Sequence, residues 1–163
     1  MVANVGGEVG KGGKKFSPRE ITRQLNIALD KDFAATAFAV LRNVIAGSPV
    51  GNPDNWALES LPPPPGYVGG HFRRNWQVST GQDLGEIEGV DTTAGAEPMA
   101  RGKAVIDAKS ATAGTGGIRL IIQNNVPYAN RLAHGWSRQA EAGWIDRQVD
   151  AALPTPGGRK DLP

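Results

Sequence analysis

Apolar residues recur every three or four positions through the first third of the chain, which predicts one long amphipathic helix. Ser17 can cap its start, Pro18 suits the first turn, and Glu20 stands where a capping box needs an acid. Gly47-Ser48-Pro49 ends it. The apolar stripe consists of Ile21, Leu25, Ala28, Leu29, Phe33, Ala37, Val40, Leu41, Val44 and Ile45. At ~1.5 Å per residue this helix would be on the order of 40 Å long, so we expect one end to pack on another subunit.

Two later segments have the patterns of β-strands. Residues 71–79 alternate, and a strand there would place Phe72, Trp76 and Val78 on one face, with Arg74 as the exception. Residues 118–123 read Ile-Arg-Leu-Ile-Ile-Gln and form the most strand-like run in the chain. We predict that this second segment is the central strand of a small antiparallel sheet.

Shorter helices are predicted around these strands. One opens at Glu97-Pro98 and continues through Ala108, and the segment from Gly114 to Gly117 ends it. Another begins near Pro127 and stops at Gly135. A last helix is expected between Trp144 and Leu153, with a strand as the alternative, whereas residues 80–95 should form a loop or a weak hairpin.

These patterns predict a single α+β domain over residues 17–153: a long N-terminal helix packed on a small antiparallel sheet with additional short helices. A chain of 163 residues fits one core. Residues 1–16 are rich in glycine and lysine and should form a flexible arm, and residues 154–163 a flexible tail. Within the domain, residues 48–70 should form an extended proline-rich loop anchored by Trp56 and Tyr67. An SH3-type ligand is the alternative for this loop, but it lacks the usual neighbouring basic residue.

Composition narrows the classes of function. The net charge of +2 is far below that of a dedicated duplex-binding protein, although lysines gather in the N-terminal arm. With no cysteine, the chain has no disulfides, thiolate nucleophiles or zinc–sulfur sites, as befits folding in a reducing cytosol. It shows neither a signal peptide nor an apolar run of ~20 residues, so we expect a soluble protein made in the cytoplasm, without a membrane partner.

Residues able to perform catalysis are scattered. His71 and His134 stand alone, without the spacing that would hold a metal. The glycine-lysine arm lacks the pattern of a phosphate-binding loop, and the acid pair Glu86/Glu88 lies in a glycine-rich loop. The pair Asp146/Asp150 is better explained as part of the solvent-exposed face of a helix. We therefore predict no enzymatic activity, no cofactor and no metal.

Large aromatic side chains stand beside proline, glycine and arginine rather than inside the long helix. Some of these aromatic side chains are explained by packing in the core or by anchoring of loops. Protein interfaces also favour aromatic residues and arginine, which bury large areas at a small entropic cost. The candidate interface residues are Trp56, Tyr67, Trp76, Tyr128, Arg131, Trp136, Arg138 and Trp144.

Three strings of residues resemble the tail-completion or neck (minor tail protein Z-like) family of long-tailed bacteriophages. The first is Ser-Pro-Val-Gly-Asn-Pro at 48–53 with Trp56, and the second is Pro-Pro-Gly-Tyr-Val-Gly-Gly at 64–70 leading into Phe-Arg-Arg-Asn-Trp-Gln at 72–77. The third is Asn-Asn-Val-Pro-Tyr-Ala-Asn-Arg-Leu-Ala-His-Gly-Trp-Ser-Arg-Gln-Ala at 124–140. They occur in the order usual for that family and span most of residues 48–143.

The resemblance implies a structural virion protein at the head–tail junction. Its copies would close into a ring, a hexamer, at the head-proximal end of the tail, with a central channel through which genomic DNA passes without sequence-specific binding. Its other partners would be neighbouring neck, terminator and tail tube proteins. The alternatives are another connector component, such as a tail terminator or head-closure protein, and a basic-armed nucleic-acid-binding protein.

Overall fold

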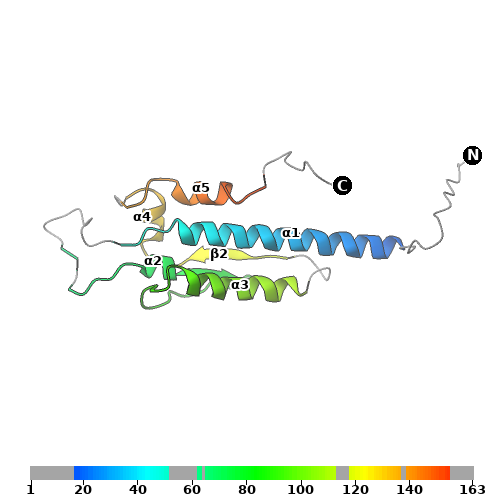
Figure 1. The fold of residues 1–163 in the computed structure, drawn as a ribbon, viewed down its shortest axis with the longest axis horizontal. Coiled ribbons are helices and arrows are strands. Elements are labelled where there is room, and N and C mark those ends of the chain that lie inside the picture. Colours follow the sequence, from blue (N-terminus) through cyan, green and yellow to red (C-terminus); the bar gives the residue numbers. More distant parts are fainter. Residues whose placement is uncertain (1–16, 52–61, 64, 113–117, 137–138, 155–163) are drawn as a thin grey trace, which may run out of the picture.

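A computed structural model describes residues 17–51, 62–63, 65–112, 118–136 and 139–154, in which helices surround a two-stranded sheet (Figure 1). In chain order the elements are α1 (Pro18–Ala46), α2 (His71–Arg74), β1 (Trp76–Ser79), α3 (Ala96–Ser110), β2 (Ile121–Asn124), α4 (Ala129–Ala133) and α5 (Trp144–Asp150). The predicted mixture of a long N-terminal helix, a small antiparallel sheet and short helices is confirmed.

The start of α1 follows from its first four residues. Pro18 occupies the first turn, and the Ser17 hydroxyl accepts a hydrogen bond from the Glu20 amide at 3.2 Å. The Glu20 carboxylate accepts bonds from the side chains of Arg23 at 2.7 Å and Gln24 at 2.8 Å. Glu20 therefore strengthens the first turn through side-chain pairs. At the other end the Gly47 amide donates to the Asn43 carbonyl at 2.8 Å, as the glycine stop predicts.

The sheet is an antiparallel ribbon in which Trp76 pairs with Asn124 and Ser79 with Ile121. Helices α1 and α3 pack together against one of its faces, where Val78 and Leu41 meet at Gly102. Residues 82–87 cover the other face, since Gln77 donates a side-chain hydrogen bond to a carbonyl of this loop. Helix α5 lies along α1, away from α3 (Figure 1).

The hydrophobic core lies around the C-terminal half of α1. Leu41, Val44 and Ile45 are at most 1% exposed, and they pack with Phe72, Trp76, Val78, Ile106, Val126 and Trp144. The N-terminal half of α1, residues 18–33, extends past the other elements (Figure 1). Its apolar residues Ile21, Leu25, Leu29 and Phe33 are 44–57% exposed. The stripe predicted as one face is therefore divided into a buried half and an exposed half.

Both predicted strands are corrected. The run at 118–123 is not a central strand, because the described sheet has two strands and the second, β2, begins at Ile121 and ends at Asn124. Residues 71–79 were expected to be extended throughout, but residues 71–74 form α2 and the strand begins at Trp76. Asn75 is fully buried at the junction, and its side chain bonds the His71 carbonyl at 2.9 Å and both the carbonyl and the amide of Ile87. These contacts with a distant loop fix the helical turn, which local alternation cannot reveal.

The remaining predicted helices are confirmed as α3, α4 and α5, and residues 80–95 contain no strand. The N-terminal arm, the C-terminal tail from residue 155, residues 52–61 and 64 of the proline-rich loop, residues 113–117, Trp56 and Arg138 lie outside the described residues.

Replacing Gly102 with alanine tests the contact between α3, α1 and the sheet. A Cβ at this position would lie 2.4 Å from Leu41 Cδ2 and 2.9 Å from Val78 Cγ2, and both side chains are buried. Overpacking costs about 1–3 kcal/mol, which outweighs the gain of about 1 kcal/mol that alanine brings to an open helix.

We expect Gly102→Ala to lower the free energy of unfolding in urea. Gly85→Ala is the control, because a Cβ there has no atom within 4 Å, and it should change that free energy by less than about 0.5 kcal/mol. A stabilised Gly102→Ala variant would contradict the packing described.

Candidate functional site

The three strings of the sequence analysis meet at the end of the molecule opposite the projecting half of α1 (Figure 1). The first and second touch through their backbones, because a Cβ built on Gly69 would lie only 2.0 Å from the Gly51 carbonyl oxygen. The Tyr67 ring packs on Gly51. The third joins the second where the Asn124 amide donates to the Phe72 carbonyl at 2.8 Å. Glycine at 51 and 69 is thus what allows these segments to approach.

The interior of this end is aromatic. The Trp76 ring nitrogen donates to the Ser48 hydroxyl at 2.7 Å, and Ser48 in turn donates to the Val44 carbonyl at 2.6 Å. The Phe72 ring meets Trp76 edge-on with ring centres 5.8 Å apart, and it meets Trp144 at 5.9 Å. Each indole is only 5% exposed. Ring burial and satisfied N–H groups make Phe72, Trp76 and Trp144 the core of this end.

This placement corrects the set of candidate interface residues. Trp76 and Trp144 were proposed as contact residues, but each is only 5% exposed: Trp144 lies in the core, and Trp76 contributes only to the lining of the groove between α1, α5, α4 and β2. The Trp144 ring nitrogen donates to the Leu132 carbonyl at 3.2 Å, which holds α5 against α4. Both tryptophans therefore support the site from beneath.

Other residues of the three strings are exposed, and we call them the motif surface: Val50, Val68, Tyr128, Arg131 and Trp136. Trp136 is 78% exposed, and its ring lies 5.8 Å from the Arg131 guanidinium. Val68 is 60% exposed and Tyr128 is 38% exposed. Tyr67 is half-buried at the edge of this surface. Exposed apolar side chains beside arginine are typical of protein–protein contacts.

Tyr128 links the motif surface to the interior. Its ring lies 6.4 Å from Phe72 and 6.5 Å from His71, measured between ring centres. Burial, followed by the proximity of Tyr67 and Glu86, raises the pKa of Tyr128 to about 12. The phenol therefore stays protonated and remains a hydrogen-bond donor throughout the neutral range.

His71 holds the 80–90 loop against this end. Its Nε2 lies 2.6 Å from a Glu86 carboxylate oxygen and its Nδ1 lies 2.5 Å from the Gly89 carbonyl oxygen. Both neighbours are acceptors, so the doubly protonated imidazolium satisfies both contacts at once. Burial by itself lowers the pKa of His71, but the bonds to Glu86 and Gly89 outweigh it and raise that pKa.

A buried aspartate organises the next turn, and our sequence reasoning missed it. Asp91 is 4% exposed and accepts hydrogen bonds from the Thr93 amide at 2.8 Å, the Thr93 hydroxyl at 2.6 Å and the Gly95 amide at 2.7 Å. Arg73 pairs with it from α2. Burial alone would raise the pKa of Asp91, but these bonds lower it to about 2. The signal was Asp91 two residues before Thr93, the pattern of an Asx turn.

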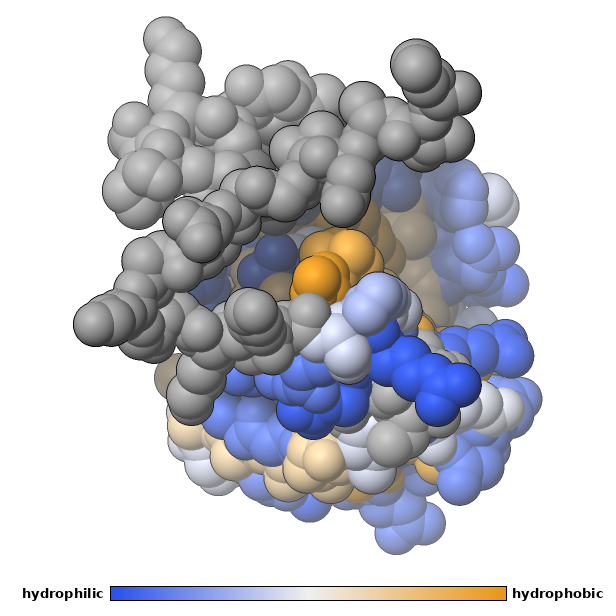
Figure 2. Space-filling view, turned by 90° about the vertical axis from the view of Figure 1, so that its right-hand side faces the viewer, coloured by the Kyte–Doolittle hydropathy of each residue, from blue (hydrophilic) through white to orange (hydrophobic). Residues whose placement is uncertain are grey.

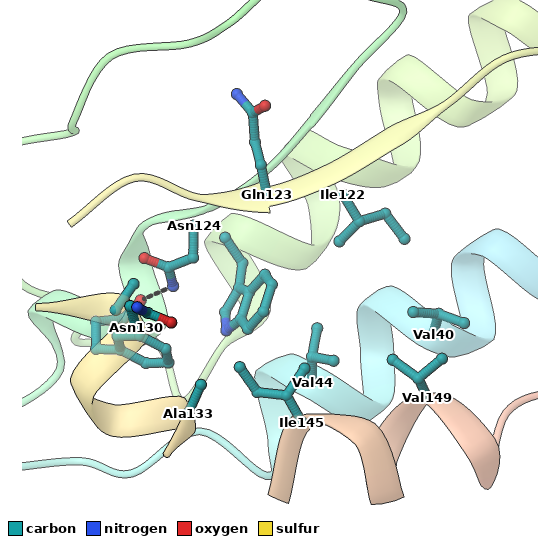
Figure 3. Close-up of a pocket in the computed structure, with 12 residues that line it drawn as sticks. Val40, Val44, Ile122, Gln123, Asn124, Asn130, Ala133, Ile145 and Val149 are labelled. Carbon is teal, nitrogen blue, oxygen red and sulfur yellow. Dashed lines mark hydrogen bonds between the residues drawn. The ribbon is translucent and has the colours of Figure 1, made fainter. Parts of the chain in front are cut away.

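An open apolar groove lies beside the motif surface, between α1, α5, α4 and β2. It has a volume of about 410 Å³. In Figure 3, Val40 of α1 and Val149 of α5 point toward one another, with Ile122 of β2 opposite. Its remaining lining residues are Val44, Phe72, Trp76, Gln123, Asn124, Ala129, Asn130, Ala133 and Ile145. Hydrophobic side chains from several elements thus remain open to an apolar occupant.

The described residues contain no cluster of three or more His, Asp or Glu side chains that could hold a metal ion. Within the same part of the chain, no helix has the length and hydropathy needed to cross a bilayer. His71 and Asp91, the groups with the most distinctive surroundings, are fully engaged in holding loops. Their contacts account for them as structural residues.

The His71 contacts predict a pH dependence of stability. A raised pKa in the folded state means that the protonated form stabilises the fold. This stabilisation is fully present below the unfolded pKa of about 6.5 and is lost as the pH rises through the higher folded value. We expect the free energy of unfolding in urea to fall as the pH rises through the folded pKa of His71. We also expect Glu86→Gln to lower the pKa of His71 in an NMR titration.

Glu88→Gln is the matched control, because Glu88 contributes its backbone carbonyl, not its carboxylate, to the contact with Arg74. This variant should leave the titration of His71 unchanged. Equal effects of the two substitutions would contradict a specific pair between His71 and Glu86.

In comparisons with protein-family models, with curated proteins and with solved structures, none matches this chain. The geometry of the site is therefore the observation that bears on its function. That geometry is an aromatic core, a motif surface above it and an apolar groove at its side.

Proposed function

We propose that the chain is a structural protein of a tailed-phage virion, a tail-completion or neck protein whose copies form a ring at the head-proximal end of the tail. The ring, a hexamer in the family that the sequence resembles, would join tail to head around a channel for DNA. The role is structural rather than catalytic.

The observation that carries this proposal is the convergence of the three strings in space. They are separated along the chain, yet Gly51 lies against Gly69 and Asn124 bonds the Phe72 backbone. Contact between the three strings in the folded chain supports a shared function more strongly than their order along the sequence does. The exposed part of that site is apolar and aromatic, as a contact surface for neighbouring proteins would be.

The charge distribution supports passage of DNA rather than tight binding. The net charge is +2, and Arg73, Arg74 and Arg101 are each paired with an acid inside the described structure. Proteins that grip a duplex expose many cations to its phosphates. Genomic DNA would then move through the ring without sequence-specific contacts, and the other partners would be the neighbouring neck, terminator and tail tube proteins.

A reconstruction of the head–tail junction of the encoding phage tests the assignment directly. We expect density for this chain in a ring between the portal and the tail tube. Finding the chain inside the capsid, or only at the distal tip of the tail, would contradict the neck assignment. Placement in an adjacent ring would favour a terminator or head-closure protein instead.

Trp136→Ala tests the motif surface. Because Trp136 is 78% exposed, its removal should change the free energy of unfolding by less than about 0.5 kcal/mol. Joining of purified tails to heads, scored by electron microscopy and infectivity, should fall by at least about tenfold if truncation costs about 1.4 kcal/mol of contact energy.

Two controls separate assembly from folding. Leu153→Ala removes an apolar side chain that is 48% exposed outside the motif surface, and it should leave joining intact. Trp144→Ala should destabilise the fold by about 3–5 kcal/mol because that ring is buried. Normal joining of tails to heads by the Trp136→Ala variant would show that the motif surface makes no essential contact in the assembly.

A further inference from the structure

We propose that the N-terminal half of α1 from one copy of this chain docks into the apolar groove of the next copy. This inference rests on the proposed ring, because it names the contact that would hold the ring together. The protein supplies both halves of the contact, a projecting helix and a receiving groove.

The helix carries a winding apolar stripe. Ile21, Leu25, Leu29 and Phe33 are spaced four residues apart, so the stripe shifts by roughly 40° at each step and covers about 120° of the helix circumference. They are 57%, 57%, 54% and 44% exposed. Figure 2 views the end of the molecule from which this helix projects, and it shows hydrophobic surface beside strongly hydrophilic surface. Anchors at such spacing are those by which a helix binds an apolar groove.

The receiving groove is aliphatic and open. Val40, Val44, Ile122, Ile145 and Val149 supply its apolar walls, and its volume is about 410 Å³. Its polar residues include Asn124 at the end of β2 and Asn130 on α4 (Figure 3). An apolar helix face would replace water along the aliphatic walls, and the asparagines would meet its polar edge.

The stripe cannot fill the groove of its own chain. Ile21 and Val40 belong to one continuous helix, and nineteen residues at ~1.5 Å each separate them by about 29 Å. Each copy therefore has a free helix at one end and a groove toward the other. Such a head-to-tail contact between unlike surfaces closes into a ring when the rotation between copies permits.

The areas are consistent with this occupant. Four large apolar side chains at about half exposure present roughly 400 Å². A standard interface buries about 800 Å² on each partner, so the stripe supplies about half of the area that one partner needs to bury. The polar flanks of four helical turns can supply the remainder. A second copy always accompanies the first in a ring, which no unrelated peptide would do.

Cysteine pairs test the contact in the full chain. The native sequence contains no cysteine, so introduced thiols react only with each other. We would mix the Leu29→Cys variant with the Val149→Cys variant and oxidise them. A disulfide-linked dimer containing one chain of each kind is expected, while each variant alone should give little product. The double variant Leu29→Cys/Val149→Cys should give a ladder of linked copies.

Two results would overturn the inference. Leu29→Cys alone cross-linking efficiently to itself would show that the stripes pair with each other as helices. Multimers seen by native mass spectrometry without the mixed disulfide would show that copies associate elsewhere, which leaves the proposed ring standing. Absence of any multimer for the full chain would count against both the contact and the ring.

A charge substitution completes the test. Leu25→Glu places a carboxylate on the stripe and should abolish the multimer, whereas Asn26→Asp adds the same charge on a neighbouring face and should retain it. Both positions are exposed, so circular dichroism and the unfolding midpoint should stay close to those of the parent chain. Equal multimer formation by the two variants would overturn the inference.

Discussion

The burial of Trp76 joins parts of the chain that are distant in sequence. Its ring nitrogen is bonded to Ser48 at the exit of α1, and its ring packs edge-on against Phe72 of α2. Its backbone pairs with Asn124 of β2, and its carbonyl accepts a bond from Arg101 of α3 at 3.3 Å. A buried indole requires an acceptor for its N–H group. The side-chain and backbone contacts of this one residue therefore link the three strings.

The position of this core explains the division of α1. Core residues gather around the last three turns of the helix, so only those turns gain from packing. The first four turns depend on the Ser17 cap and on the solvent-exposed Glu20–Arg23 pair, and such local interactions are weak in water. An isolated helix of this length is marginal in water. A contact that buries the stripe would give the N-terminal turns of α1 the packing that they lack. The proposed docking supplies such a contact.

The sequence predicted those elements whose signals are local. The cap at Ser17, the stop at Gly47 and the Pro98 opening of the second long helix are properties of a few adjacent residues, and they match α1 and α3. The turn at 71–74 was mistaken for a strand because its conformation depends on Asn75 reaching Ile87. The roles of the tryptophans were equally hidden. An indole suits a core or an interface, and only the distant acceptors Ser48 and Leu132 show which applies to Trp76 and Trp144.

The energetics of the proposed docking favour assembly through many contacts rather than one. Burying roughly 400 Å² of apolar stripe at about 25 cal/mol per Å² yields on the order of 10 kcal/mol. Association costs an estimated 4–15 kcal/mol in lost translational and rotational freedom, so a single helix in a single groove is close to balance. Closing a ring changes this balance, because the last subunit makes two contacts while losing its freedom only once. A subunit with one free helix and one open groove would therefore be weakly associated by itself and firmly held once its ring is complete.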